Sequence, residues 1–422
     1  MAEHMLWELM KSKYIQRFLL AVVVLTAAVC ILASVFSKDM SIPSEAIYQA
    51  LEGKADILFE FGSYDSIEIL NGEKGYFAVS DDGIEKVVNR DGEVLLDIGM
   101  NAYEKVRCGD YYLLDGIRLV LVNCQTLELT EYPLGLPQLH PSGKYLLGSH
   151  DDGLWKVICT EDGKVIYESQ EKLKWTQKEG CVVEQPENGP ERIVNLKTGK
   201  VEFTAEKGQE IEDGNDDFWL IQDDNCQFVL DAAYQMHSNW PLFRRASLGD
   251  GVVIGTAIEG ASAADLKEYR HDGIFMEPDI RVFNQSGEEV YWLDSINIRY
   301  LGNVGNTLAM RNMQDDSFIY RTVGPDGLEE EIISPDYYIY PSDDQFAPAY
   351  QMAYSGQDPM KPSAEPIMSE SMEYRWTFVN KNMEPLTECV LYGAGIPENG
   401  YAVIRDEKWQ WALIDLRQRG ES

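Results

Sequence analysis

Short apolar runs separated by polar turns fill most of this chain. Residues 75–80, "GYFAVS", are followed by "DDG", and the next run, "IEKVVN", alternates apolar and polar positions in part. Such alternation is typical of a β-strand, and Asp-Gly supplies the positive φ angles that tight hairpin turns require. The pattern therefore predicts antiparallel hairpins. Nine Asp-Gly pairs occur, and their first residues are Asp82, Asp91, Asp115, Asp152, Asp162, Asp213, Asp250, Asp272 and Asp326.

The hairpin pattern recurs at a nearly constant spacing. The phrases "NRDGEVLLD", "TEDGKVIYE", "LKTGKVEFT" and "NQSGEEVYW" share a turn that is followed by an apolar strand. Successive turn positions lie 35, 36 or 36 residues apart over the first four units, and later units follow two insertions. Recurrence at this period is typical of repeat architectures. The aligned turn positions are Gly92, Leu127, Gly163, Gly199, Gln235, Gly287, Gly327, Met383 and Gln418.

One repeat has room for four short strands, so the sequence predicts an all-β chain. In the first unit we expect these strands at "GYFAVS", "IEKVVN", "EVLLDIG" and "AYEKVRC". Four antiparallel strands per ~36 to 40 residues describe one blade of a β-propeller, and neighbouring blades bury each other's faces. We expect about eight four-stranded blades, within a range of seven to nine. An open β-solenoid of the same hairpins is the alternative. The chain ends near the third strand of its last unit, so we expect residues 63–70, "SYDSIEIL", to complete that blade and close the ring.

The longest apolar run differs from all the others. Residues 18–36, "FLLAVVVLTAAVCILASVF", contain no charge, and as a helix they span about 28 Å, close to a bilayer core. Basic residues precede the run, which places the N-terminus in the cytoplasm and the large domain outside it. A cleaved signal peptide is the alternative, with "LAS" at residues 32–34 as its cleavage site. A short helix is predicted at residues 44–54, with Ser44 as its cap.

These patterns divide the chain into four parts with different expected roles. We expect a cell-membrane protein with a single transmembrane helix. Its parts are a cytoplasmic tail (1–17), a transmembrane helix (18–36), a linker with a short helix (37–59) and an exported β-repeat domain (60–422).

The charge balance narrows the choice of partners. The chain has 36 basic and 71 acidic residues, a net charge of −35, and residues 1–37 carry +1 of it. An exported domain with this charge repels phosphate backbones, so nucleic acid is excluded as a partner. Six of the seven cysteines lie in the exported part, and they form no CxxC pair. They are open to two interpretations, disulfides or buried free thiols.

Two segments carry a resemblance to known families. The stretches "YFAVSDDGIEKVVNRDGEVLL" and "GYAVIRDEKWQWALIDLRQRG" resemble bacterial WG repeats, and "LWKVICTEDGKVIYE" resembles blades of quinoprotein-type propellers. The Trp-Gly pair itself is missing, because Lys156 follows Trp155 and Ala412 follows Trp411. No motif matches the residues that bind the quinoprotein cofactor, so no cofactor is expected. The resemblance implies a propeller fold, export and a binding role.

Candidate chemistry is sparse along the chain. No GxSxG, HExxH, P-loop or GxGxxG motif is present. One stretch, "DGNDDFWLIQDD", imitates a calcium loop, with Asp213, Asn215 and Asp217 at alternate positions and Asp224 at position twelve. Phe218 replaces the usual glycine of such a loop, and a solvated turn before a strand is the competing interpretation. Acidic residues abound, but their number singles out no glycosidase pair.

The two insertions are the stronger functional signal. Residues 257–279 lengthen one unit, and residues 341–372 interrupt the strand rhythm with Pro, Ser and Met. Long insertions on a rigid scaffold often carry binding function. We expect Tyr350, Met352 and Tyr354 to contact a ligand, because such side chains bury a large area. The sequence thus predicts a non-catalytic surface protein that binds or scaffolds a protein or a cell-wall glycan. An exported, glycan-directed hydrolase that uses acidic residues is the alternative.

Overall fold

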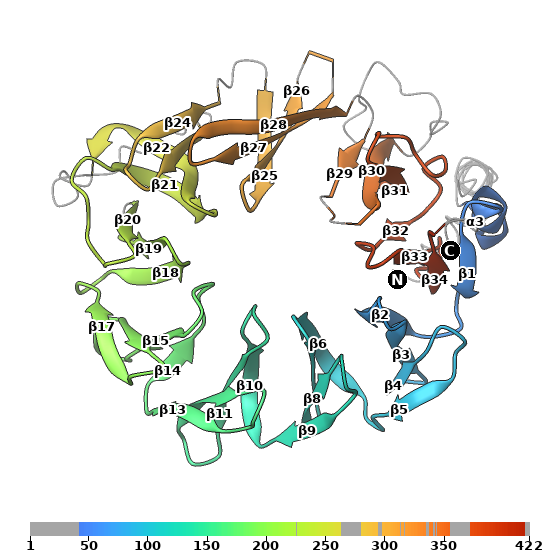
Figure 1. Ribbon diagram of the computed structural model, residues 1–422, viewed down its shortest axis with the longest axis horizontal. Coiled ribbons are helices and arrows are strands. Elements are labelled where there is room, and N and C mark those ends of the chain that lie inside the picture. The colour runs from blue at the N-terminus through green and yellow to red at the C-terminus, as the bar shows by residue number, and fades with distance from the viewer. Residues whose placement is uncertain are drawn as a thin grey trace, which may run out of the picture.

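The chain forms a ring of antiparallel β-sheets with their strands stacked outward from a central axis (Figure 1). The computed structural model describes residues 42–417, apart from residues 225, 263–279, 294–297, 313, 316, 335–336, 341, 343 and 355–371. The predicted transmembrane segment, residues 18–36, lies outside the described residues. Among those that are described, no helix has the length and apolar character needed to span a bilayer.

The strands group into consecutive blades, which we number in chain order. Blade 1 contains β2 (Ser66–Asn71), β3 (Tyr76–Asp81), β4 (Ile84–Val88) and β5 (Val94–Asp97); blade 2 contains β6 (Ala102–Cys108), β7 (Tyr111–Gly116), β8 (Leu119–Asn123) and β9 (Leu129–Tyr132); blade 3 contains β10 (Leu134–Leu139), β11 (Tyr145–His150), β12 (Trp155–Cys159) and β13 (Val165–Ser169); blade 4 contains β14 (Lys172–Lys174), β15 (Cys181–Gln185), β16 (Arg192–Asn195) and β17 (Lys200–Thr204).

The second half of the ring is less regular. Blade 5 contains β18 (Glu210–Gly214), β19 (Phe218–Gln222) and β20 (Gln227–Asp231); blade 6 contains β21 (Pro241–Leu248), β22 (Val252–Ser262), β23 (Ile280–Asn284) and β24 (Glu289–Trp292); blade 7 contains β25 (Ile298–Val304), β26 (Thr307–Asn312), β27 (Phe318–Gly324) and β28 (Gly327–Ser334); blade 8 contains β29 (Tyr338–Ile339), β30 (Phe346–Tyr354) and β31 (Met372–Asn380); blade 9 contains β32 (Gly393–Ala394), β33 (Tyr401–Arg405), β34 (Trp411–Asp415) and β1 (Asp56–Phe59).

The described residues thus make nine blades, one more than the eight we expected from the sequence. Hydrogen bonding alone gives eight sheets, because blades 5 and 6 are joined into one seven-stranded sheet by a single paired position, Gln227 with Phe243. The packing of the buried side chains shows that blades 5 and 6 are nevertheless two separate blades. Nine clusters of buried apolar side chains occur among the described residues, and each lies mainly at one of the nine junctions between neighbouring blades.

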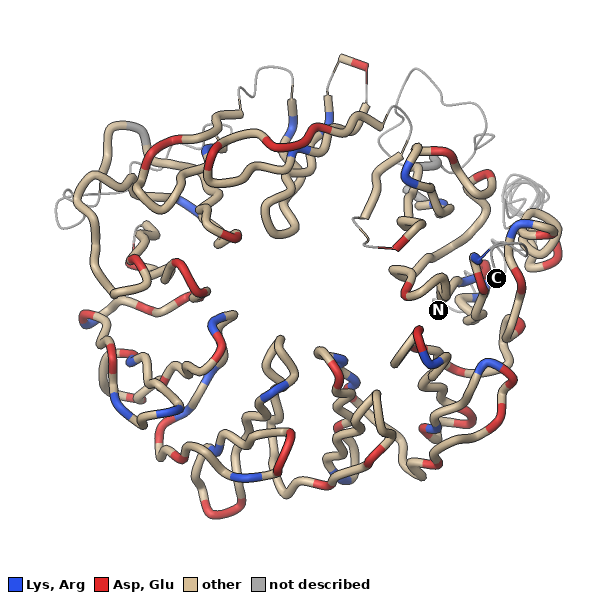
Figure 2. Tube along the Cα trace, viewed as in Figure 1, with Lys and Arg blue, Asp and Glu red and all other residues tan. Residues whose placement is uncertain are grey.

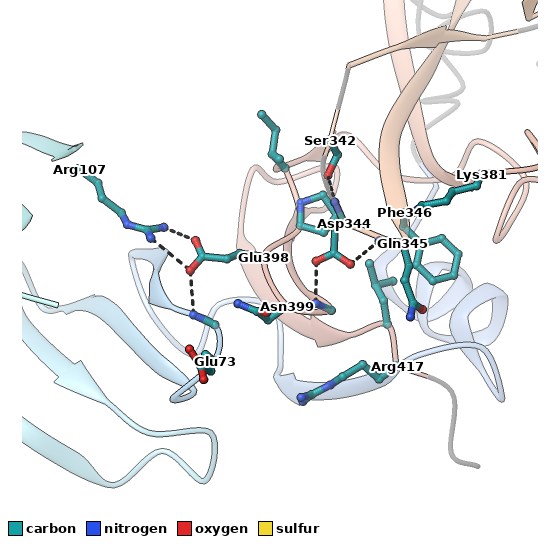
Figure 3. Close-up of a pocket in the computed structure, with 15 residues that line it drawn as sticks. Glu73, Arg107, Ser342, Asp344, Gln345, Phe346, Lys381, Glu398, Asn399 and Arg417 are labelled. Atoms are coloured by element: carbon teal, nitrogen blue, oxygen red, sulfur yellow. Dashed lines mark hydrogen bonds and ion pairs between the residues drawn. The ribbon is translucent and has the colours of Figure 1, made fainter. Parts of the chain in front are cut away.

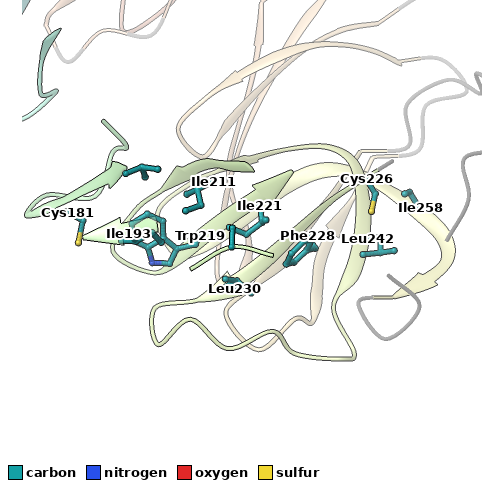
Figure 4. Packing of buried hydrophobic residues seen from close by; sticks show 12 residues of the cluster. Cys181, Ile193, Ile211, Trp219, Ile221, Cys226, Phe228, Leu230, Leu242 and Ile258 are labelled. Atoms are coloured by element: carbon teal, nitrogen blue, oxygen red, sulfur yellow. The ribbon is translucent and has the colours of Figure 1, made fainter. Parts of the chain in front are cut away.

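The junction between blades 4 and 5 shows how the sequence specifies this packing (Figure 4). Successive side chains of a strand point to opposite faces of its sheet. In β19, Trp219 and Ile221 pack toward blade 4, while Phe218 and Leu220 pack toward blade 6. Both faces are buried, so the strand reads as the continuous apolar run "FWLI". Each fully buried side chain of this size contributes ~1.5–3 kcal/mol.

The ring is closed by β1, which contradicts the open-solenoid alternative. Strand β1 pairs antiparallel with β34, so residues 56–59 supply the outermost strand of the last blade. We had expected residues 63–70 to do so, but Ser66–Asn71 is β2, the first strand of blade 1. The expected linker, residues 37–59, therefore contains a strand of the propeller.

The helix α3 (Ser44–Leu51) is packed against blade 9. It begins after Pro43 and ends three residues earlier than expected, and Ser44 does not cap it. Instead, the hydroxyl of Ser44 donates a 2.7 Å hydrogen bond to the buried carboxylate of Asp406. Ile47 and Leu51 are buried in the core between blades 8 and 9.

Strand direction gives the ring two distinct faces. Antiparallel strands alternate in direction, so all turns between the first and second strands of a blade lie on one face, which we call the lower face. All turns between second and third strands lie on the opposite, upper face. Both long insertions, in β22–β23 and β30–β31, join second to third strands and so begin and end at the upper face.

The repeated turns that the structure describes are confirmed in their backbone conformation, and the last predicted position, Gln418, lies outside the described residues. The turn position has a positive φ in Leu127 and Met383 as well as in the aligned glycines, and in the fifth unit Tyr234 takes it one residue before the aligned Gln235. Asp82 and Gly83 both have positive φ, as a type I′ hairpin turn requires. Two Asp-Gly pairs, at 115 and 213, lie inside strands instead. Gly214 is needed there because a Cβ would meet the Trp219 ring at 2.2 Å.

Candidate functional site

An Asn or Asp side chain organises most of the repeated turns, and the sequence patterns did not reveal it. The Oδ1 atom of Asn195, for example, accepts hydrogen bonds from the amides of Lys197 (3.0 Å) and Thr198 (3.1 Å). This side chain holds the turn from the end of the third strand, as Asx turns do. The available signal was an Asn three or four residues before the turn glycine, as in Asn89–Gly92, Asn284–Gly287 and Asn195–Gly199. The residues in this role are Asn89, Asn123, Asn195, Asp231, Asn284, Asn380 and Asp415.

The four side chains of the calcium-loop-like stretch, Asp213, Asn215, Asp217 and Asp224, do not converge on one point. Asp213 accepts hydrogen bonds from Gln177 of blade 4, and Asp217 accepts them from Gly251 and Gln285 of blade 6. Asp224 lies beyond the far end of β19, and a five-residue strand spans ~16 Å. No group of three or more potential metal-ligating side chains forms within the described ranges. Asp213 and Asp217 join neighbouring blades instead.

The cysteines of the described residues are all free thiols. Burial raises the pKa of Cys124 to about 12 and that of Cys226 to about 11. Thiols with such pKa values remain protonated at neutral pH and are poor nucleophiles. Cys124 and Cys226 pack as small apolar side chains at the junctions between blades 1 and 2 and between blades 4 and 5.

A cavity of about 870 Å³ lies at the lower face, among the turns of blades 8, 9 and 1 (Figure 3). An ion pair between Arg107 and Glu398 crosses it. Glu398, in the turn between β32 and β33, accepts hydrogen bonds from the guanidinium of Arg107 in blade 2 and from the Gly72 amide (2.9 Å) in blade 1. Burial is the largest single effect and disfavours the charge of Arg107, but the hydrogen bond and the charge attraction of Glu398 together outweigh it, so the pKa of Arg107 is raised. Asp344 likewise accepts a 2.8 Å hydrogen bond from the Gly400 amide.

The polar contacts of this cavity therefore hold the ring closure together. We call the ion pair of Arg107 and Glu398 the latch. Glu398 joins three consecutive blades, 9, 1 and 2, at the point where the two ends of the propeller meet. Figure 2 shows that acidic and basic residues are both distributed around the whole ring.

The most distinctive surface feature is a group of aromatic rings in blade 8, which we call the aromatic patch. It consists of Tyr338, Tyr340, Tyr350, Tyr374 and Trp376. The register explains the group, because Tyr350 is paired with Tyr338 on one side and with Trp376 on the other. Its ring centroid is 5.0 Å from the centroids of Tyr338, Tyr374 and Trp376.

The aromatic patch is open to solvent at two of its rings. Tyr374 is 46% exposed and Tyr340 is 39% exposed, and Tyr340 stacks on Trp376 with centroids 5.5 Å apart. Burial and the neighbouring tyrosines raise the pKa of Tyr350. The phenol therefore stays protonated at neutral pH and can donate a hydrogen bond.

The structure places the three expected contact residues on one strand. Tyr350, Met352 and Tyr354 all belong to β30, paired with Trp376, Tyr374 and Met372 of β31. Tyr350 lies at the centre of the aromatic patch. The sequence prediction missed the other four rings, because they come from β31, from β29 and from Tyr340 directly after β29, which become neighbours through strand pairing.

Comparison with protein families finds no family that matches the sequence, and comparison with characterised proteins finds no match either. Solved structures are similar at low sequence identity. BamB from Moraxella catarrhalis is 9% identical with a TM-score of 0.36, and the match covers 86% of this chain and 99% of that chain. The computationally designed Ika8 protein is 11% identical with a TM-score of 0.36, covering 86% and 100%. Dihydro-heme d1 dehydrogenase NirN is 12% identical with a TM-score of 0.36, covering 74% and 72%. The propeller fold of this chain follows from its own strand pairing and blade interfaces.

Proposed function

We propose that this chain is a membrane-anchored, extracytoplasmic propeller that binds a protein or a cell-wall glycan and does not itself catalyse a reaction. The observation that carries the proposal is the aromatic patch. Aromatic side chains that keep part of their surface exposed supply large contact area at a small entropic cost, and they dominate binding energies at interfaces.

The position of the aromatic patch supports the same proposal. Strand β30 lies within the longer of the two insertions, residues 341–372, and β31 begins where that insertion ends. Binding residues commonly occupy such departures from a regular scaffold. The tyrosine hydroxyls add polar contacts, which suit either a glycan or a protein surface.

The anchoring part of the proposal rests on the sequence of residues 18–36. The uncharged run and the basic residues before it favour a retained transmembrane helix with a cytoplasmic N-terminus. The WG-repeat resemblance supports an exported binding protein, although the Trp-Gly pair is missing.

The experiment compares two exposed tyrosines in the same purified protein. Tyr374→Ala removes an exposed ring of the aromatic patch, and Tyr103→Ala removes a ring that is 79% exposed in blade 2. Co-sedimentation with cell-wall polysaccharide and cross-linking in a membrane extract measure the two ligand classes. We expect Tyr374→Ala to weaken capture at least tenfold, an effect of about 1.4 kcal/mol, and Tyr103→Ala to leave it unchanged.

Equal capture by both variants would refute the role of the aromatic patch. Release of soluble sugars from the polysaccharide would instead favour the alternative, an exported glycan hydrolase.

A further inference from the structure

We propose that the upper face of the propeller lies against the membrane surface at blade 9, with Trp409 inserted into the lipid interface. This inference rests on the proposed membrane anchor and adds the orientation of the domain and a lipid contact. It follows from the position of Ile42, the first described residue, and from the side chains of blade 9 that lie near it.

The first step is the fixed position of the entry point. The amide of Ile42 donates a 2.7 Å hydrogen bond to the hydroxyl of Tyr392, and Ser44 is bonded to Asp406. Asp406 also accepts hydrogen bonds from the amides of Lys408 (3.0 Å) and Gln410 (2.8 Å), so it organises the β33–β34 turn. The start of α3 is thus attached directly to an upper-face turn of blade 9.

The second step is the length of the connection. The predicted transmembrane segment ends at Phe36, and only residues 37–41 separate it from Ile42. An extended chain of this length reaches about 20 Å at most. Ile42 is therefore held within that distance of the point where the chain leaves the bilayer, and Ser44, two residues further on, is bonded to the β33–β34 turn.

The third step is the chemistry of the turn itself. Trp409 is 62% exposed, and its backbone has a φ of 60°, a conformation that residues other than glycine adopt rarely. The Arg405 guanidinium lies 3.6 Å from the ring centroid of Trp411 and 5.4 Å from that of Trp409, and Lys408 is exposed beside them. Tryptophan with adjacent basic side chains is the combination enriched where proteins meet lipid headgroups.

The same face carries a second exposed apolar tip. Ile117 lies in the β7–β8 turn of blade 2, which is also a turn between second and third strands. Tyr374 of the aromatic patch also lies near the upper face, because it is the third residue of β31 and β31 starts at that face. A ligand held by the aromatic patch would then be bound close to the membrane.

The test uses the full-length protein reconstituted into liposomes that contain brominated phosphatidylcholine, which quenches tryptophan on contact. Trp409→Phe is compared with Trp175→Phe, which changes a tryptophan in the lower-face turn between β14 and β15. We expect Trp409→Phe to lose a quenchable component of the emission and Trp175→Phe to keep it. Retention on liposomes after an alkaline carbonate wash reports separately on the anchor.

The outcomes separate the inference from the proposal on which it rests. Protein that is washed off the liposomes would refute the anchor. Protein that is retained, with the same quenched fraction in wild type and in Trp409→Phe, would refute the lipid contact and leave the anchor standing. An equal loss in both variants would refute the orientation, since the lower face would then contact lipid as well.

Discussion

The ring closure predicts that a single residue of β1 stabilises the whole propeller. Phe59 is 6% exposed, and its ring packs edge-on against Tyr64 at 5.3 Å and Phe77 at 5.9 Å. Its cluster joins blade 9 to blade 1 and includes Leu413 of the strand with which β1 pairs. Phe59→Ala removes these contacts and leaves a cavity, which costs ~3–5 kcal/mol.

The expected change in melting temperature follows from the size of the domain. Unfolding entropy is about 2.1 cal/mol/K per residue, or roughly 0.7 kcal/mol/K for the roughly 330 described residues. A loss of about 4 kcal/mol therefore lowers the Tm by about 6 °C in differential scanning calorimetry. Val94→Ala is the control, because Val94 is 54% exposed on the outer strand β5, and its effect should be below about 0.5 kcal/mol.

A closed ring also predicts which strand loses protection in Phe59→Ala. Amides of β34 should exchange with deuterium faster in Phe59→Ala, because β1 covers the edge of that strand. A Tm equal to that of Val94→Ala, with unchanged exchange in β34, would refute the reasoning that the β1–β34 closure supports the ring.

Three further predictions concern the latch, a buried histidine and the repeated turn. In a double-mutant cycle of Arg107→Ala and Glu398→Ala, urea denaturation should give a coupling of about 1–2 kcal/mol, since the pair is half-buried and charge-assisted; additive effects would contradict the latch. Burial lowers the pKa of His140 below 6.5, so the unfolded chain takes up a proton that the native state rejects, and stability should decrease as pH falls through about 6.5. His140→Asn keeps an acceptor for the following turn and should flatten that decrease in pH-dependent melts, whereas an unchanged slope would exclude His140 as its cause. Asn195→Ala should cost about 1 kcal/mol in the same urea assay, because two amides lose their acceptor, and Asn195→Asp should largely restore it.

The repeat itself could be predicted from the sequence because its determinants are local. The turn position needs a positive φ, and glycine or a residue that tolerates this conformation marks it at a constant spacing. Leu127 was aligned on spacing alone, and its φ of 60° confirms the alignment. The buried strands were equally visible, since a strand that packs on both faces reads as a continuous apolar run.

The assignment of strands to blades could not be predicted in the same way. The link between two blades and the turn within one blade are both short and polar, so "AYEKVRC" was expected as the fourth strand of one unit. In the structure, Ala102–Cys108 is β6, the first strand of the next blade. This shift by one strand also displaced the expected closure from residues 56–59 to residues 63–70.

The aromatic patch could be predicted only in part, for the same reason: strand pairing is not visible in the sequence. Tyr350 was found because it lies in a segment that departs from the repeat, whereas Tyr338 and Trp376 lie 12 and 26 residues away and become its neighbours only through the register of β29, β30 and β31. Strand pairing converts distant positions into one surface, and this register is fixed by the buried face of the same strands. Ile339, Ala349 and Val379 pack on blade 7 and so hold the strands in the register that brings the rings together. Mutations of these three buried residues should therefore disturb ligand capture indirectly, whereas Tyr374→Ala should reduce it with little change in stability, and comparing the two distinguishes contact with a ligand from support of the rings.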